Sequence, residues 1–383
     1  MLHDPEAHEP LVDDDWNEER ARAAIRRIVG EADAAFDPHR LWPPNEWDVW
    51  TATPPLSGIY VGASGVVWAL DALRRDGLAE TRIDLVAASR RALEKYREQP
   101  DFTDPPHGHA SLWVGESGIL LVAWRLERTP ELADALHARV RENARNDANE
   151  LMWGAPGTML AARAMHGWTG DERWSTVWRE SANELVGRWE DDGLWTQRLY
   201  GKVRRHLGPP HGFAGNVLAL AQGGALTPEL RRRAADAAAR TAVVEDGLAN
   251  WPPHDGMGLA DSDGEIRVQW CSGAPGMVTA LADVLDDELL LAGAELTWRA
   301  GPLRKGAGLC HGTAGNGYAL LKAFARTGDE RWLERARRFA VHALRQAEAA
   351  PPRYSLWTGG VGAALYTADC LDGRAGVPTI DVW

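Results

Sequence analysis

Cysteine is scarce in this chain of 383 residues, which contains only three cysteines. Three thiols cannot build a disulfide framework, and at least one of them must stay unpaired. Residues 1–6 show no basic stretch leading into an apolar one, so a secretory signal peptide is not expected. These two absences favour a reducing, cytoplasmic compartment.

Long apolar runs and an excess of basic charge are also lacking. No window approaches about eighteen consecutive apolar residues, so no membrane span is predicted. The formal net charge is −13 at pH 7, whereas a generic binder of nucleic acid or of anionic membranes needs a basic face. With 45% hydrophobic and 25% charged residues, the chain has the composition of a soluble globular protein with a sizeable core.

Motifs for phosphate chemistry are absent as well. We find no GxxxxGK[ST] phosphate-binding loop and no protein-kinase signature. Alternating Val, Ile and Thr runs longer than about four residues are also missing, which argues against an extended β-sheet. The sequence therefore predicts an all-α protein without a kinase domain.

What the sequence does contain is a repeated pair of glycines three residues apart, each pair followed by an apolar run rich in Ala and Leu. The spacing between pairs, roughly 40 to 60 residues, is typical of stacked supersecondary units. The seven pairs are Gly62/Gly65, Gly115/Gly118, Gly154/Gly157, Gly212/Gly215, Gly273/Gly276, Gly312/Gly315 and Gly359/Gly362.

Each apolar run predicts a buried inner helix, and the charged amphipathic stretches between the pairs predict outer helices that cover the inner ones. The outer helices are expected at residues 18–36, 85–98, 132–146, 174–189, 228–244, 283–292 and 330–349. Seven such pairs bury their apolar helices most simply by closing into a ring. We therefore expect one domain over residues 1–383, an α/α toroid with GxxG turns at the N-terminal ends of the inner helices. An open solenoid is the alternative.

Two of the turns carry side chains that bind metals. Cys271 lies in QWCSGAPG at residues 269–276, and Cys310 and His311 adjoin each other in GLCHGTAGN at residues 308–316. Two thiolates and an imidazole are ligands that zinc accepts, and three protein ligands are typical of a catalytic zinc site. The residues alone leave open the alternative of two buried core thiols. The third cysteine, Cys370, lies inside the last apolar run and is expected to be a core residue.

Taken together, these motifs closely resemble the lanthionine synthetase C-like (LanC-like) family, from about Pro54 to the last repeat. Three motif sequences are most similar to those of the stand-alone, glutathione-binding branch: VQWC at 268–271, GLCH at 308–311 and ELMWG at 150–154. The resemblance implies an α/α barrel with one zinc ion held by Cys271, Cys310 and His311. It also implies an enzyme that adds a thiol across dehydroalanine or dehydrobutyrine to form a thioether. The thiol comes from a cysteine of the same peptide in lantibiotic cyclases and from glutathione in the eukaryotic-type branch.

The resemblance implies roles for four further residues. His211, immediately before a GxxG pair, is expected to be the general acid, and Arg267 is expected to stabilise the enolate. Glu150 stands where cyclases carry Asp, and either takes part in proton transfer or stabilises a helix N-terminus. Lys305 matches a lysine that contacts glutathione. From the residues alone, a helix-capping histidine at 211 and solvated loop side chains at 267 and 305 remain the alternatives.

Ser272 departs from the family pattern, in which Tyr or His follows the first cysteine.

The sequence leaves three hypotheses for the function of the protein. The first is a zinc enzyme that adds glutathione or a peptide cysteine to a dehydroamino-acid-containing peptide, or a dedicated lanthipeptide cyclase acting on one precursor. The second is a catalytically weak regulatory protein that binds zinc and glutathione. The third, a carbohydrate hydrolase or epimerase on a similar toroid, leaves the Cys and His motifs unexplained.

The source of the dehydro residues is the last expectation from the sequence. Some members of the family carry fused kinase and lyase domains that create these residues, and this chain shows no kinase signature. We therefore expect a separate dehydratase or kinase–lyase partner.

Overall fold

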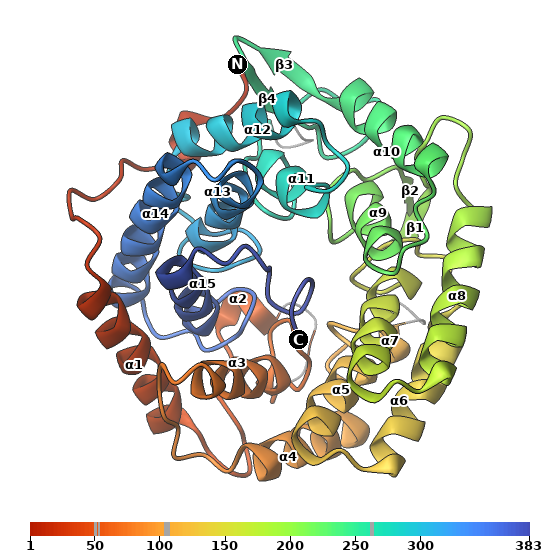
Figure 1. The fold of residues 1–383 in the computed structure, drawn as a ribbon. Helices are drawn as coiled ribbons and strands as arrows, with labels where there is room; N and C mark the ends of the chain where they lie inside the picture. The colour runs from red at the N-terminus through yellow and green to blue at the C-terminus, as the bar shows by residue number, and fades with distance from the viewer. Residues whose placement is uncertain (50–51, 53, 103–107, 261–263) are drawn as a thin grey trace.

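Two concentric rings of helices form the protein (Figure 1). The computed structural model describes residues 1–49, 52, 54–102, 108–260 and 264–383. Within these residues the outer ring comprises α1 (Glu18–Ala35), α4 (Leu85–Glu98), α6 (Pro130–Asn143), α8 (Glu172–Gly187), α10 (Pro228–Thr241), α12 (Asp287–Ala300) and α14 (Glu330–Ala349). The inner ring comprises α3 (Ala63–Arg75), α5 (Glu116–Glu127), α7 (Ala155–Thr169), α9 (Phe213–Gln222), α11 (Ala274–Ala280), α13 (Thr313–Thr327) and α15 (Gly360–Asp372).

The ring closes because the first and last repeats pack on each other. Helix α1 packs against α15, and α15 packs against α3. This arrangement confirms the predicted α/α toroid, and the open-solenoid alternative is wrong. The physical reason is that the inner helices are apolar on almost their whole circumference, as in α5, where every residue from Ile119 to Trp124 is buried.

The outer helices agree with the prediction to within three residues at each end, except for the one expected at 283–292. The helix expected at 228–244 ends at Thr241, because residues 243–245 form a strand. The helix expected at 283–292 instead spans Asp287–Ala300, because the Asp286 carboxylate accepts the Leu289 backbone N–H and sets the start of the helix.

Two short hairpins were not expected from the sequence. In the first, β1 (Gln197–Leu199) pairs with β2 (Lys202–Arg204), and in the second, β3 (Val243–Glu245) pairs with β4 (Leu248–Asn250). Each turn places two residues in the left-handed region, such as Tyr200 and Gly201 with φ of 52° and 69°. Strands of three residues are too short to show an alternating pattern. The remaining short elements are η1 (Pro5–Ala7), α2 (Glu46–Val49) and η2 (Gly108–Ala110).

The second glycine of each GxxG pair lets a loop carbonyl pack against the first turn of the inner helix. A Cβ at Gly315 would lie 1.7 Å from the carbonyl oxygen of Leu309, and one at Gly118 would lie 1.9 Å from that of Leu112. In every repeat the contact is with the carbonyl six residues earlier. The seven loops therefore share this close contact, and equivalent positions of each loop lie around one mouth.

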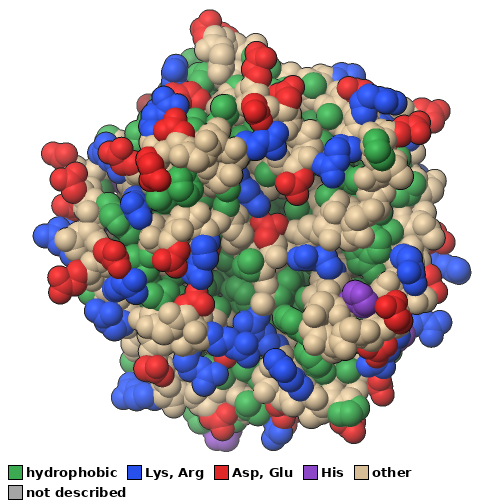
Figure 2. All heavy atoms as spheres, in the orientation of Figure 1, with side chains coloured by type: hydrophobic (Ala, Val, Ile, Leu, Met, Phe, Trp, Pro, Cys, Tyr) green, Lys and Arg blue, Asp and Glu red, His purple; other side chains and the backbone are tan. Residues whose placement is uncertain are grey.

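The end of the chain lies near the centre of the ring (Figure 1). Asp381 accepts hydrogen bonds from Gln222 Nε2 at 2.8 Å and Lys322 Nζ at 2.9 Å, and its carbonyl accepts one from Arg163 at 3.1 Å. Those three partners belong to α9, α13 and α7. On the face drawn in Figure 2, hydrophobic side chains lie in the central hollow and charges of both signs surround it.

None of the helices in the described residues combines the length and apolar character that a membrane crossing requires.

Candidate metal centre and substrate pocket

The loops that lead into the inner helices place equivalent side chains around one pocket of about 900 Å³. Two positions of the repeat matter, the second and the first residue before the leading glycine. The second residues are Tyr60, Trp113, Met152, Pro210, Cys271, Cys310 and Trp357, and the first residues are Val61, Val114, Trp153, His211, Ser272, His311 and Thr358. Ten of these fourteen residues line the pocket.

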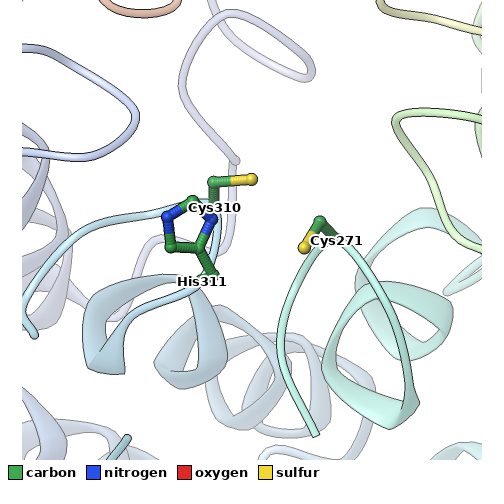
Figure 3. A group of neighbouring side chains, drawn as sticks. All are labelled: Cys271, Cys310 and His311. Atoms are coloured by element: carbon green, nitrogen blue, oxygen red, sulfur yellow. The ribbon is translucent and has the colours of Figure 1, made fainter. Parts of the chain in front are cut away.

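The structure brings together the three residues predicted to bind a metal (Figure 3). One ligand atom each of Cys271, Cys310 and His311 can be chosen so that all three lie within 4.8 Å of one another. The two loops are tied by a hydrogen bond of 3.0 Å from the Cys271 backbone N–H to the Cys310 carbonyl. Within the part of the chain that the structure describes, the group contains these three residues and no fourth His, Cys, Asp or Glu.

A hydrogen bond couples the two thiols, and it shifts their pKa values in opposite directions. A hydrogen bond from Cys310 and the neighbouring His311 lower the pKa of the Cys271 thiol, although burial opposes the shift. The same hydrogen bond, together with burial, raises the pKa of Cys310. This hydrogen bond favours a thiolate on Cys271 and the shared proton on Cys310. Two soft donors and an imidazole at this separation fit a zinc ion, which would take the place of that proton.

Gln269 contacts this cluster, and no sequence pattern predicts the contact. Its Nε2 donates a hydrogen bond of 3.0 Å to Cys271 Sγ, and the side chain is buried. Backbone hydrogen bonds join Gln269 and Ser272 in both directions, and Gly273 follows with φ of 109°, which a larger residue rarely adopts. This tight turn directs the amide at the sulfur. The contact depends on the geometry of this turn, which the sequence of residues 269–272 does not predict.

His211 and Glu150 form a pair on the wall of the pocket. His211 Nδ1 lies 2.9 Å from Glu150 Oε2, and the Glu150 side chain is fully buried. The Glu150 carboxylate also accepts backbone N–H groups from Met152, Trp153 and Gly154, at the start of α7. His211 lines the pocket, whereas Glu150 lies behind it. The structure therefore places Glu150 in contact with the imidazole and with the helix N-terminus together.

Basic side chains dominate the pocket walls. Arg267 and Lys305, both expected at the site, lie 3.7 Å and 3.6 Å from the carboxylate of Glu265. The other basic lining residues are Lys202, Arg204, Arg304 and Arg353. Among the described lining residues there is no Asp or Glu. A chain of net charge −13 thus concentrates positive charge at one cavity.

Aromatic rings pack against one another beside the two sulfurs. Trp270 and Trp357 have ring centroids 4.6 Å apart, and Trp113 lies 4.8 Å from Trp357. Tyr60 stacks on this cluster and hydrogen bonds to the Cys310 sulfur. Burial raises the pKa of Tyr60 well above its usual value, so the phenol stays protonated. This packing fixes the loops that carry the thiols, and it gives a structural role to three of the chain's 19 tryptophans.

Fold and site together define a class: an α/α barrel whose loops bring two cysteines and a histidine to the wall of a basic pocket. Residues 52–381 match the family described as lanthionine synthetase C-like protein. The chain belongs to this family, which confirms the resemblance inferred from its motifs.

Individual relatives agree with this assignment. Glutathione S-transferase LANCL1 of Danio rerio is 34% identical over 135 residues, which cover 31% of this chain and 32% of the relative. LanC-like protein GCL1 of Arabidopsis thaliana is 38% identical over 97 residues, 22% of each chain. The alignments thus span less than a third of the curated relatives. The solved structure of nisin cyclase has a TM-score of 0.61 at 15% identity, over 92% of this chain and 94% of that one, and shows the shared fold.

Proposed function

We propose that this protein is a zinc-dependent enzyme that adds a thiol across a dehydroalanine or dehydrobutyrine residue and forms a thioether. The observation that carries the proposal is the cluster of Cys271, Cys310 and His311, with ligand atoms within 4.8 Å, on a pocket that His211 and Arg267 also line. Three such ligands match a catalytic rather than a structural zinc site. The bound ion would lower the pKa of a substrate thiol, so that the thiolate is available at neutral pH.

The chain's own residues govern the bond-making step. The thiolate sulfur forms a bond to the β-carbon, and the electron pair of the double bond moves toward the α-carbon and its carbonyl, which gives an enolate. Arg267 lines the pocket, and its guanidinium offsets this negative charge. Protonated His211 then gives its proton to the α-carbon, and the proton lost by the thiol returns to the imidazole through solvent.

Glu150 acts through His211 and is a positioning residue. Because Glu150 Oε2 bonds to Nδ1, the other ring nitrogen of His211 remains for the substrate. Three backbone N–H groups fix the Glu150 carboxylate, so the imidazole is held in one orientation. The buried carboxylate also stabilises the protonated ring that donates to the α-carbon.

Glutathione is the thiol that the pocket favours. Lys305 and the other basic lining residues suit a thiol donor that carries carboxylates. The zebrafish relative bears the name glutathione S-transferase, which supports the same choice. A peptide cysteine, as a dedicated lanthipeptide cyclase would use, is the second thiol to test. In either case a separate dehydratase or kinase–lyase supplies the dehydro residue.

Ser272 favours a second candidate, a regulatory protein that binds zinc and glutathione but turns over weakly. The side chain lines the pocket, and within the described residues its hydroxyl makes no hydrogen bond. Where the family places Tyr or His, this chain therefore offers only a short hydroxyl.

Mass spectrometry separates the two candidates. The zinc-loaded protein is mixed with glutathione and a dehydroalanine peptide, and a parallel reaction uses a peptide with an internal cysteine. The enzyme proposal expects a glutathione adduct or a cyclised peptide, and neither product with Cys310→Ala. Inert peptides in both reactions, with zinc bound, would establish the binding protein instead.

A further inference from the structure

Exposed apolar side chains gather at the mouth of the pocket. Trp47 is 71% exposed and Tyr200 is 62% exposed, yet both line the pocket, as does Met257. Of the nine large hydrophobic side chains that are exposed in the described part of the chain, these three are at the pocket. Exposed apolar side chains grouped at a cavity mark a binding surface.

Two basic side chains at the same mouth lack an acidic partner among the described residues. Lys202 and Arg204 of β2 are exposed and line the pocket, and neither forms an ion pair with any described residue. The other basic side chains there have neighbours of opposite polarity: Arg353 pairs with Asp48, and Arg304 donates to the Glu6 carbonyl. The β1–β2 hairpin therefore presents charge that no described residue of the protein neutralises.

The hairpin is anchored to the catalytic loops. Trp153 Nε1 donates a hydrogen bond of 2.8 Å to the Tyr200 hydroxyl, and the Tyr200 ring meets His211 edge-on at 6.2 Å between centroids. On the inner side, Gln197 is buried and bonds to the Asn149 carbonyl. A ligand on Tyr200 thus lies beside the proposed general acid.

We propose that this rim, defined as Trp47, Tyr200, Lys202, Arg204 and Met257, binds the peptide that carries the dehydro residue, and selects acidic and large apolar residues flanking that residue. This inference rests on the proposed function, and it specifies the class of peptide that the proposed enzyme takes as its substrate. Charge complementarity decides the chemistry, because the described lining holds six cations and no carboxylate.

The geometry of the ring fits an extended peptide. Helix α2, which carries Trp47, belongs to the first repeat, and the β1–β2 hairpin precedes the fourth inner helix, so they lie on different arcs of a seven-repeat ring (Figure 1). A chain that spans the mouth reaches an apolar anchor on each side, and the anchor at Tyr200 lies beside His211. Glutathione is small and needs only the Lys305 side of the pocket.

The test measures binding without turnover. The zinc-loaded protein is titrated into fluorescent peptides that carry alanine in place of the dehydro residue, flanked by Trp and Glu, or by Trp and Lys. The test variant is Lys202→Glu/Arg204→Glu. The control is Arg198→Glu, an exposed residue of the same hairpin that does not line the pocket. Zinc content and glutathione addition to a small free dehydroalanine amide are measured in parallel.

The acidic peptide should bind about tenfold or more tightly than the basic peptide, and the double variant should lose that preference, while Arg198→Glu keeps it. Trp47→Ala should weaken both peptides. Equal binding of the acidic peptide by the double variant and the wild type would overturn the proposal, as would equal affinity for both peptides in the wild type. If the rim variants lose the peptide but no thiol adds to the small amide, the rim stands and the enzyme proposal fails.

Discussion

At the scale of single residues, the site takes its chemistry from two positions of a sevenfold repeat. Cys271 and Cys310 stand two residues before a leading glycine, whereas His211 and His311 stand one residue before. Because equivalent positions of the seven loops lie at one end of the ring, ten of the fourteen side chains at these positions line the same pocket, and these four are among them. The candidate metal ligands and the proposed acid are thus brought together by the repeat and not by closeness in sequence.

Removing a sulfur should remove the metal. With Cys310→Ala only two of the three ligands remain, so zinc per chain after dialysis should fall from about one to near zero. Elemental analysis measures this ratio. Cys370→Ala is the matched control, because that thiol is buried in α15 away from the cluster. Full zinc content in Cys310→Ala would refute the assignment of the ligand.

Replacing His211 by alanine should lower kcat by about 10²–10⁴-fold, the usual contribution of a general acid, with zinc content unchanged. Glu150→Gln should lower kcat less, because the amide can still contact Nδ1 but no longer stabilises the charged ring. Steady-state kinetics with a dehydroalanine peptide measures both effects. Wild-type kcat in His211→Ala would exclude the proposed role.

Gln269 should contribute to zinc affinity as well as to turnover. Gln269→Leu removes the N–H···S hydrogen bond to Cys271, and loss of such a partner typically weakens metal binding by about 10–100-fold. Competition with a chromophoric chelator gives the zinc affinity without any assay of activity. Ser272→Ala serves as control, since within the described chain that hydroxyl makes no hydrogen bond. Identical affinities in both variants would show that the hydrogen bond is incidental.

At the scale of elements, inner and outer helices begin differently. Every outer helix has an Asp, Asn or Thr side chain that accepts a backbone N–H at its start. Every inner helix begins at a glycine, which offers no side-chain cap. The N-terminal ends of the inner helices therefore add partial positive charge to the mouth. Helix dipoles and basic side chains act in the same direction on an anionic substrate.

The GxxG glycine also yields a prediction at this scale. Gly315→Ala places a Cβ 1.7 Å from the Leu309 carbonyl oxygen, so it should destabilise the fold by roughly 1–3 kcal/mol or more. Gly30→Ala, on an exposed and open part of α1, should stabilise it by about 0.5–1 kcal/mol. Denaturant unfolding compares the two variants. A neutral Gly315→Ala would mean that the loop contact has no structural role.

At the scale of the whole molecule, one end of the ring holds the candidate site and the chain's last residues link the inner helices. The mouth formed by the helix N-termini carries the candidate metal centre, and the chain's last residues tie three inner helices together. The Asp381 carboxylate ties Gln222 of α9 to Lys322 of α13, and its backbone carbonyl accepts a hydrogen bond from Arg163 of α7. Stability and chemistry are therefore assigned to separate parts of the same barrel.

Asp381→Ala tests this separation. Loss of two side-chain hydrogen bonds that link α9 and α13 should cost roughly 1–3 kcal/mol in the free energy of unfolding. Zinc content should stay at the wild-type level, because the candidate metal centre lies at the N-terminal ends of the inner helices. Unfolding curves and elemental analysis on the same samples provide both readings. A variant that loses zinc while folded would show that the two ends are coupled.

The sequence by itself predicted the toroid and the candidate metal-binding side chains. Seven glycine pairs, each followed by an apolar run, predict an inner helix in every repeat, and ring closure buries those helices. Cys310 and His311 are adjacent in the sequence, so a set of three candidate zinc ligands required only one further cysteine. Local patterns carry this information because helical periodicity and turn residues are properties of short segments.

Only the tertiary structure decided how distant side chains meet. The hydrogen bond of Gln269 to Cys271, the burial of Glu150 behind His211 and the approach of the β1–β2 hairpin to the pocket all depend on loop geometry. The hairpins themselves are too short for any periodic signal. Contacts between residues 61 positions apart, such as Glu150 and His211, follow from the closure of the ring, which no local segment encodes.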